Sequence, residues 1–407
     1  MVARKKIEFK YLLHIHDFIL DNSNVLTKDI EEIDLFDIII SNPPYFKLSK
    51  DDPKTLSAKS LVSGQPNIYS IFMGIASKLL QKEGELIFIT PRSFASGNYF
   101  KAFRVFFFNT VQIERIHLFN SRKETFNRDK VLQETVIVKA KREKINPEKE
   151  VVVSSSIGLK DIETPKIKFF KSEELIDLNT PEKILHLPTN EKEEAILNLV
   201  LSWHNKLIDF NIQVSTGPVV SFRSWDYIQN NYENGTVFLA PLFWLHNVNK
   251  MKLEWPVTLK EKGQYIRIEP KSKSLLIANR NYILLRRFST KDDKSRLIAA
   301  PYFSKSSKTE FIGVENKLNY IYRIKGDLEQ VELLGLCAVL NSELFDTYFQ
   351  IFNGNVNVSA TELREMKFPS LETIKEIGNR LILANDYSIG YINALVNECF
   401  ELEAILN

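Results

Sequence analysis

A run of apolar residues in this chain ends abruptly at two consecutive prolines, within the motif Asn42-Pro43-Pro44-Tyr45. The segment just before it, at positions 36–40, ends in three β-branched isoleucines and predicts a buried strand. Each proline fixes its backbone φ at about −65° and has no amide N–H, so the loop after the strand is rigid. The sequence therefore predicts a strand that ends in a fixed loop presenting an amide, carbonyl oxygens and an aromatic ring.

Those groups suit an exocyclic amine on a planar ring. The side-chain oxygen of Asn42 and the carbonyl oxygen of Pro43 can each accept one N–H of the amine, while Tyr45 stacks on the ring. Held in this way, the amine lone pair points toward an electrophile, and catalysis needs positioning but no strong base. The alternative is that the four residues form an ordinary proline turn.

The motif resembles the catalytic loop of the gamma-type adenine-N6 DNA methyltransferases of bacterial type II restriction–modification systems. The resemblance implies S-adenosylmethionine as cofactor, double-stranded DNA as substrate, and a cognate restriction endonuclease in the same system without a stable complex. It implies an α/β fold with a Rossmann-like class I methyltransferase sheet. A mixed, largely β target-recognition domain with C-terminal helices is expected to follow.

The segment after the motif alternates between helical and strand patterns. Helices are predicted at 68–81 and 99–108, and strands at 84–91, 113–119 and 134–140. This alternation is typical of a doubly wound parallel sheet. The turn Thr90-Pro91-Arg92-Ser93-Phe94 is similar to one in the resembled family.

Further site residues follow from the resemblance. Residues 7–18 are expected to form a strand that leads into a loop, where Asp17 accepts the amino group of the cofactor's adenine and Phe18 packs on its ring. The alternative is a helix-capping Asp beside a core Phe. Phe126 is expected to stack on the target base opposite Tyr45, after the base has left the duplex. Lys130, close to it in the chain, suits a DNA phosphate.

The glycine-rich loop that binds the cofactor's amino-acid end in the resembled family has no counterpart in this chain. The expected sheet therefore lacks its first strands at the N-terminal side, which leaves two apolar edges. The chain is expected to be truncated, split or degenerate, and to bind S-adenosylmethionine poorly when alone. An upstream polypeptide that completes the cofactor site is one possible partner.

The C-terminal half is expected to bind DNA. Residues 251–310 hold fourteen Lys and Arg against six Asp and Glu, with aromatic residues between them, although the whole chain has a net charge of only +3. The alternative is a solvated basic face. The DNA-binding candidates are Arg223, Arg280, Arg286, Arg287, Asn355 and Asn357. A helix is predicted at 332–349, and Ser359 is expected to cap the next one.

Length and composition fit a folded protein of two domains, with 407 residues and 44% hydrophobic content. The expected boundaries are a catalytic domain at 1–145, a connector at 146–190 and a recognition domain at 191–407. Two distant cysteines and six scattered histidines form no metal-binding spacing, so no metal is expected. Without a long apolar run or signal peptide, the expected compartment is the cytoplasm, with no membrane partner.

Two rival functions stay open at this stage. The chain can be a sequence-specific DNA-binding protein without catalysis, which the missing glycine loop favours. Alternatively, the motif loop can methylate another planar amine, such as guanine N2 in RNA or a protein glutamine. The basic C-terminal half argues against a protein substrate.

Overall fold

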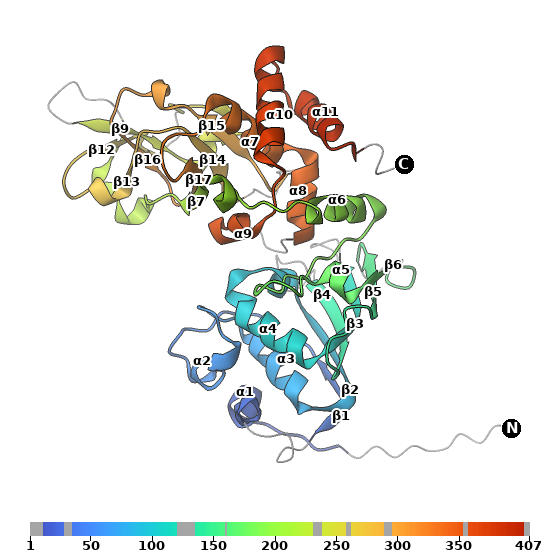
Figure 1. Cartoon of the computed structure of the whole chain (residues 1–407). Helices are drawn as coiled ribbons and strands as arrows, with labels where there is room; N and C mark the ends of the chain where they lie inside the picture. Colours follow the sequence, from blue (N-terminus) through green and yellow to red (C-terminus); the bar gives the residue numbers. More distant parts are fainter. Residues whose placement is uncertain are drawn as a thin grey trace.

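The computed structural model describes residues 11–27, 35–119, 135–158, 161–230, 238–257, 262–288, 295–352 and 357–402. Two units follow one another along the chain. Figure 1 shows an N-terminal α/β unit, coloured blue to green, and above it a C-terminal unit that runs from green to red.

The N-terminal unit is built on a six-stranded sheet with the strand order β1-β2-β4-β3-β5-β6. Its strands are β1 (Phe36–Ser41), β2 (Leu80–Pro91), β3 (Gln112–Phe119), β4 (Thr135–Lys141), β5 (Glu150–Ser156) and β6 (Lys166–Lys171). Only the pairs β1/β2 and β3/β5 are parallel. The prediction of a parallel sheet was therefore wrong, because β4 inserts antiparallel between β2 and β3.

Helices cover this sheet, and Figure 1 shows α3 and α4 lying across its face. The helices of the unit are α1 (Phe18–Asn22), α2 (Pro53–Ser57), α3 (Ile68–Leu79), α4 (Lys101–Thr110) and α5 (Ser172–Leu175). The core beneath α4 is aromatic, since Phe103 and Phe107 stack with ring centroids 5.1 Å apart and both are fully buried. The helix predicted at 68–81 and the strands predicted at 84–91, 113–119 and 134–140 are confirmed.

The strand before the proline motif differs from its prediction. β1 lies at the edge of the sheet, with β2 as its only strand neighbour among the described residues. Three of its apolar side chains are exposed, Phe36 by 52%, Ile38 by 58% and Ile40 by 72%. The prediction of a buried strand was wrong, because β-branched composition reports strand tendency and burial depends on what covers the strand.

The structure differs from two other local predictions. Residues 11–17 contain no strand, although one was predicted at 7–18, and Phe18 begins α1. Residues 1–10 lie outside the described part. β5 and β6 extend the sheet to Lys171, past the expected domain boundary at residue 145.

The C-terminal unit contains three small sheets, so the predicted β-rich region is confirmed. One sheet has the order β13-β16-β9-β12-β8, another β15-β14-β17-β7, and β10 pairs with β11. The strands are β7 (Ile212–Thr216), β8 (Ile228–Gln229), β9 (Leu239–Phe243), β10 (Val248–Asn249), β11 (Lys252–Leu253), β12 (Tyr265–Arg267), β13 (Leu276–Ala278), β14 (Tyr282–Arg286), β15 (Ala299–Tyr302), β16 (Phe311–Val314) and β17 (Leu318–Arg323).

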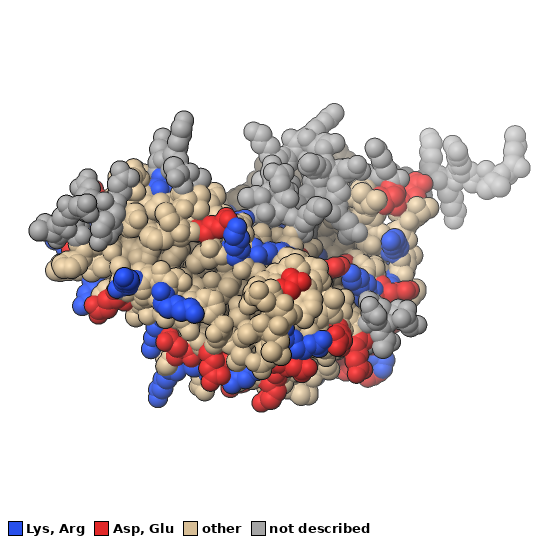
Figure 2. Space-filling model, turned by 90° about the horizontal axis from the view of Figure 1, so that it is seen from above, with Lys and Arg blue, Asp and Glu red and all other residues tan. Residues whose placement is uncertain are grey.

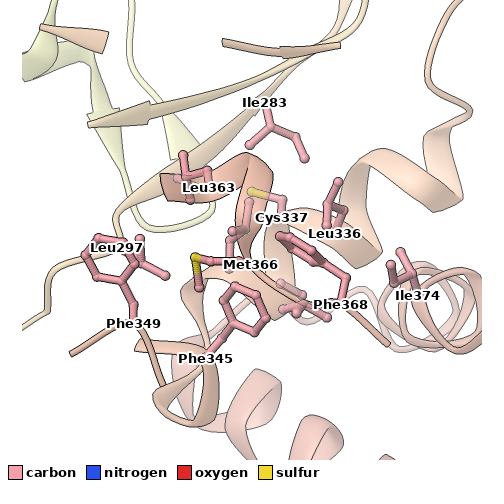
Figure 3. Packing of buried hydrophobic residues seen from close by; sticks show 14 of the residues in the cluster. Ile283, Leu297, Leu336, Cys337, Phe345, Phe349, Leu363, Met366, Phe368 and Ile374 are labelled. Atoms are coloured by element: carbon pink, nitrogen blue, oxygen red, sulfur yellow. The ribbon is translucent and has the colours of Figure 1, made fainter. Parts of the chain in front are cut away.

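Helices close this unit around its largest apolar core. They are α6 (Glu191–Leu201), α7 (Gln330–Asn341), α8 (Glu343–Phe352), α9 (Ala360–Glu365), α10 (Leu371–Ala384) and α11 (Ile389–Cys399). Figure 3 shows Phe345, Met366 and Phe368 gathered in this core, where the rings of Phe345 and Phe368 lie 4.9 Å apart. The helix predicted at 332–349 is two helices, because Ser342 adopts an extended conformation. The predicted cap by Ser359 is confirmed.

Candidate active site

The proline motif forms the loop that leaves β1 beside the carboxyl end of β2. Ser41, the last residue of β1, pairs with Phe88 of β2 in parallel register. Asn42 and Pro44 are exposed, Pro43 is buried and Tyr45 is half-buried. The structure therefore brings the predicted catalytic residues together at the end of a strand, with the Asn42 amide open to solvent.

The Tyr45 hydroxyl anchors this loop. It lies 2.6 Å from Oδ1 of Asn42 and 2.8 Å from the carbonyl oxygen of Ile89, so its single proton can be donated to either. Burial raises the pKa of Tyr45 to about 12, which keeps the phenol a neutral donor. An amide oxygen has two lone pairs, so Asn42 can accept from Tyr45 and from one further N–H.

The Tyr45 ring rests on a second tyrosine. Tyr69, at the start of α3, meets it edge-on with ring centroids 6.1 Å apart, and Tyr69 is fully buried. The Tyr69 hydroxyl lies 2.8 Å from Oγ of Ser93, in the predicted turn at residues 90–94. Sequence reasoning did not single out Tyr69, because an aromatic residue on an apolar helix face looks like any core residue.

The comparisons with known proteins agree with one another. A family model described as Eco57I restriction-modification methylase matches residues 3–126. The type II methyltransferase M.PstI of Providencia stuartii is 33% identical over 363 residues, which cover 89% of this chain and 70% of M.PstI. M.BsuBI of Bacillus subtilis, also a type II methyltransferase, is 34% identical over 393 residues, or 95% of this chain and 76% of that protein. This chain belongs to the type II DNA methyltransferases of restriction–modification systems.

A solved structure supports the fold. The type IIL restriction-modification enzyme MmeI, determined in complex with DNA, matches with a TM-score of 0.53 and 10% sequence identity. The match covers 91% of this chain and 53% of MmeI, so the methyltransferase chain spans about half the length of that enzyme. The similarity extends through both units and concerns the fold alone.

In this methyltransferase, Asp17 and Phe18, the residues predicted to bind the cofactor, make contacts within the protein. Oδ1 of Asp17 accepts from the backbone N–H groups of Ile19 and Leu20, 3.1 Å away in each case, and Oδ2 lies 3.0 Å from Nζ of Lys54. Burial raises the pKa of Asp17, but the Leu20 hydrogen bond and Lys54 outweigh it and hold the pKa below its usual range. Phe18 stacks on Phe72 at 4.8 Å.

This geometry matches the alternative of a helix-capping Asp beside a packed Phe. Each carboxylate oxygen can accept more than one hydrogen bond, so these partners leave Asp17 able to accept the amino group of the cofactor's adenine. The role of Asp17 and Phe18 in cofactor binding stays a prediction.

The DNA-binding candidates occupy different surroundings. Arg223 is exposed over the Phe222 ring at 5.2 Å, and Arg280 is half-buried. Arg286 donates to the carbonyl oxygen of Val248, and Arg287 donates to that of Asn316, both at 2.6 Å. Arg286 and Arg287 therefore hold loops in place, whatever else they contact.

The remaining candidates divide into described and undescribed residues. Asn357 is exposed and forms a backbone bridge with Phe288. Phe126, Lys130 and Asn355 lie outside the described residues. On the face seen in Figure 2, Lys and Arg alternate with Asp and Glu, so this face carries no field of one sign.

The described residues contain neither a metal site nor a membrane-spanning helix. In those ranges no group of three or more His, Cys, Asp and Glu is arranged to hold a metal ion. No helix in the described part is both long and apolar enough to cross a bilayer.

Proposed function

We propose that this chain is an adenine-N6-specific methyltransferase that acts on duplex DNA. The observation that carries the proposal is the hydrogen bond from the Tyr45 hydroxyl to Oδ1 of Asn42. When the hydroxyl donates to Oδ1 of Asn42 rather than to Ile89, it holds the Asn42 amide with its oxygen next to the ring that is to hold the base. This leaves one lone pair of that oxygen for the target amine.

The residues of the chain act by orienting the amine. Oδ1 of Asn42 and the Pro43 carbonyl oxygen each accept one amine N–H, which directs the nitrogen lone pair out of the plane of the ring. S-adenosylmethionine, when bound, would supply an electrophilic methyl group, whose bond to the sulfonium sulfur breaks with the electron pair left on sulfur. As the N–C bond forms, the nitrogen becomes positive and gives up one of its two protons to solvent through these oxygens, since Asn42 is exposed. Tyr45 stacks on the base, which must leave the duplex to reach the loop.

We also propose that a polypeptide strand pairs with β1 and supplies the missing cofactor ligands. The place of β1 at the edge of the sheet in the described residues supports this, because an unpaired strand edge is a ready template for another strand. The upstream polypeptide expected from the sequence is the occupant that we propose.

The test is Asn42→Ala, compared with Asn109→Ala on the exposed side of α4 as a matched control. Losing an electrostatic contact of this kind lowers the rate of methyl transfer by roughly 100- to 1,000-fold. DNA binding, measured by fluorescence anisotropy, should stay within about twofold of wild type because Asn42 contacts only the amine. A rate for Asn42→Ala within tenfold of the control would contradict the proposed role.

The rival is a DNA-binding protein without catalysis, which the lack of a glycine-rich cofactor loop in this sequence favours. It predicts selective DNA binding that S-adenosylmethionine does not change, and no methyl transfer even when β1 has a partner strand. Titrating S-adenosylmethionine into the DNA-binding assay separates these two functions.

A further inference from the structure

Tyr69 is a buried tyrosine whose hydroxyl is bonded to the turn after β2. Its side chain is fully buried, and its hydroxyl lies 2.8 Å from Oγ of Ser93, which is 4% exposed. Burial raises the pKa of Tyr69, although hydrogen bonds with Ser93 and with the Phe94 backbone lower it, so the phenol is neutral. The buried hydroxyl is therefore paired, as buried polar groups nearly always are.

The core that surrounds this pair is apolar. The Tyr69 ring packs on the Phe100 ring with centroids 5.4 Å apart, in a cluster that also holds Met73 and Phe88. Phenylalanine and alanine would fill the same space, and replacing both partners of a buried hydrogen bond by apolar groups is often nearly neutral for stability. Stability alone therefore does not explain the hydrogen bond between Tyr69 and Ser93.

The ring of Tyr69 is in direct contact with the motif loop. It meets the Tyr45 ring at an interplanar angle of 88°, with centroids 6.1 Å apart. This T-shaped arrangement is a preferred one for aromatic pairs, and Tyr69 leaves at least one face of the Tyr45 ring uncovered. Tyr69 thus supports Tyr45 while a ring face stays free for the target base.

Tyr69 is attached at both ends to segments that flank the motif loop. At the backbone, the residue before Tyr69 donates its N–H to the carbonyl oxygen of Phe46 at 3.0 Å, directly after Tyr45 in the chain. At the hydroxyl, Ser93 lies in the turn that follows β2, shortly after Ile89, whose carbonyl oxygen is 2.8 Å from the Tyr45 hydroxyl. Tyr69 and Tyr45 therefore rest on the same two segments.

We propose that Tyr69, held by Ser93, is a positioning residue for methyl transfer. It touches neither base nor cofactor, and it fixes the plane of the Tyr45 ring on which the base is to stack. Because the Tyr45 hydroxyl moves with its ring, the same contact fixes the distance from that hydroxyl to Oδ1 of Asn42. A misplacement of about 1 Å can lower a rate by about 100-fold, so a small tilt of Tyr45 is enough to slow transfer. This inference rests on the proposed function.

The test removes hydroxyl groups while the core stays filled. The variants are Tyr69→Phe, Ser93→Ala and the two combined, each made in the wild type and in Tyr45→Ala. The controls Tyr348→Phe and Ser77→Ala remove buried hydroxyl groups in α8 and at the far end of α3. The protein is the chain together with whatever polypeptide pairs with β1. Single-turnover methyl transfer, the Kd for duplex DNA and thermal unfolding are measured for each, and Ser93→Ala decides alone if Tyr69→Phe does not fold.

In the wild-type background, Tyr69→Phe and Ser93→Ala should each slow methyl transfer roughly tenfold, with the Kd for DNA within about threefold of the controls. The double variant should be no slower than either single variant, because both changes remove the same hydrogen bond. In the Tyr45→Ala background, all three should react within about twofold of Tyr45→Ala itself, since Tyr69 acts through the Tyr45 ring.

Two results would overturn the inference and leave the proposed function standing, as long as Asn42→Ala still removes the activity. One is a rate for Tyr69→Phe and Ser93→Ala within about twofold of the controls. The other is equal slowing by Tyr69→Phe with and without the Tyr45 ring, which would show an effect on the fold and not on Tyr45. If the wild type transfers no methyl group to adenine, the proposed function fails and this inference fails with it.

Discussion

At the scale of single residues, the Tyr45 hydroxyl links the proposed chemistry to the sheet. It contacts the Asn42 amide oxygen and also the Ile89 carbonyl oxygen near the end of β2. The four motif residues were predictable because prolines and an asparagine in that order leave few backbone conformations. The role of Tyr69 was not predictable, since it depends on contacts with Tyr45 and Ser93 that are made across the fold.

Tyr45→Phe tests the hydroxyl separately from the ring. The variant keeps the stacking surface and loses one hydrogen bond to Asn42, worth about 1 kcal/mol. Single-turnover methyl transfer should therefore slow about fivefold, whereas Tyr45→Ala should slow it much further. Equal rates for Tyr45→Phe and wild type would show that the hydroxyl does not orient the amide.

The raised pKa of Tyr45 predicts how the rate depends on pH. An ordinary tyrosine loses its proton near pH 10, but burial raises the pKa of Tyr45 to about 12, so the hydroxyl stays a donor well above pH 10. Rate profiles of wild type and Tyr45→Phe should run parallel from pH 8 to pH 10.5. An inflection near pH 10 in the wild type alone would contradict the burial of this phenol.

At the scale of elements, the spacing of apolar residues predicted which segments form helices and which form strands. α3, β2, β3 and β4 occur close to their predicted positions, because apolar periodicity decides whether a segment is a helix or a strand. Strand order and burial are decided by distant neighbours, so the placement of β4 and the exposure of β1 were missed. The break at Ser342 was missed as well, because apolar residues continue through it.

The contact between α7 and α10 depends on two glycines. A Cβ on Gly335 would lie 1.9 Å from the carbonyl oxygen of Ile374, and one on Gly378 would lie 1.9 Å from that of Val331. Gly335→Ala should therefore lower the free energy of unfolding by about 3 kcal/mol or more in urea titrations. Gly390 in α11 has open space around it, so Gly390→Ala should raise this free energy by roughly 0.5 to 1 kcal/mol. Similar effects of the two changes would contradict the close helix contact.

A buried ion pair joins α7 to β17. Oε2 of Glu332 lies 2.6 Å from Nη2 of Arg323, and the Glu332 side chain is 3% exposed. Burial raises the pKa of Glu332, but Arg323 and Lys375 outweigh it, so the pKa in the folded protein lies below the unfolded value. The stabilisation is present above the unfolded pKa, about 4.3, and is lost as the pH falls through the folded pKa.

Glu332→Gln should cost about 3 kcal/mol at pH 7, because Arg323 is left without its buried partner. The difference from wild type should shrink as the pH falls below about 4, where the wild-type carboxylate also becomes neutral. Chemical unfolding at a series of pH values measures both effects. A difference that is constant from pH 7 to pH 3 would contradict the ion pair.

At the scale of the whole molecule, the two units meet through buried contacts. Nη2 of Arg92, in the turn after β2, donates to the carbonyl oxygen of Ile351 in α8 at 2.6 Å. The motif loop is thereby held at a fixed place relative to the C-terminal unit. Both units could be predicted from the sequence in outline, but a cleft of about 580 Å³ between them could not, because residues of its walls such as Asn67 and Arg287 are 220 residues apart in the sequence.

The most direct test of the central claim is transfer of a labelled methyl group from S-adenosylmethionine to duplex DNA, followed by nucleoside analysis. The assay is run with the 407-residue chain alone and with the chain plus the polypeptide encoded directly upstream. N6-methyladenine should form only with both polypeptides and should disappear with Asn42→Ala. Label in cytosine, RNA or protein, or a rate that Asn42→Ala leaves unchanged, would contradict the account. Full activity of the chain alone would contradict the role given to the edge of β1.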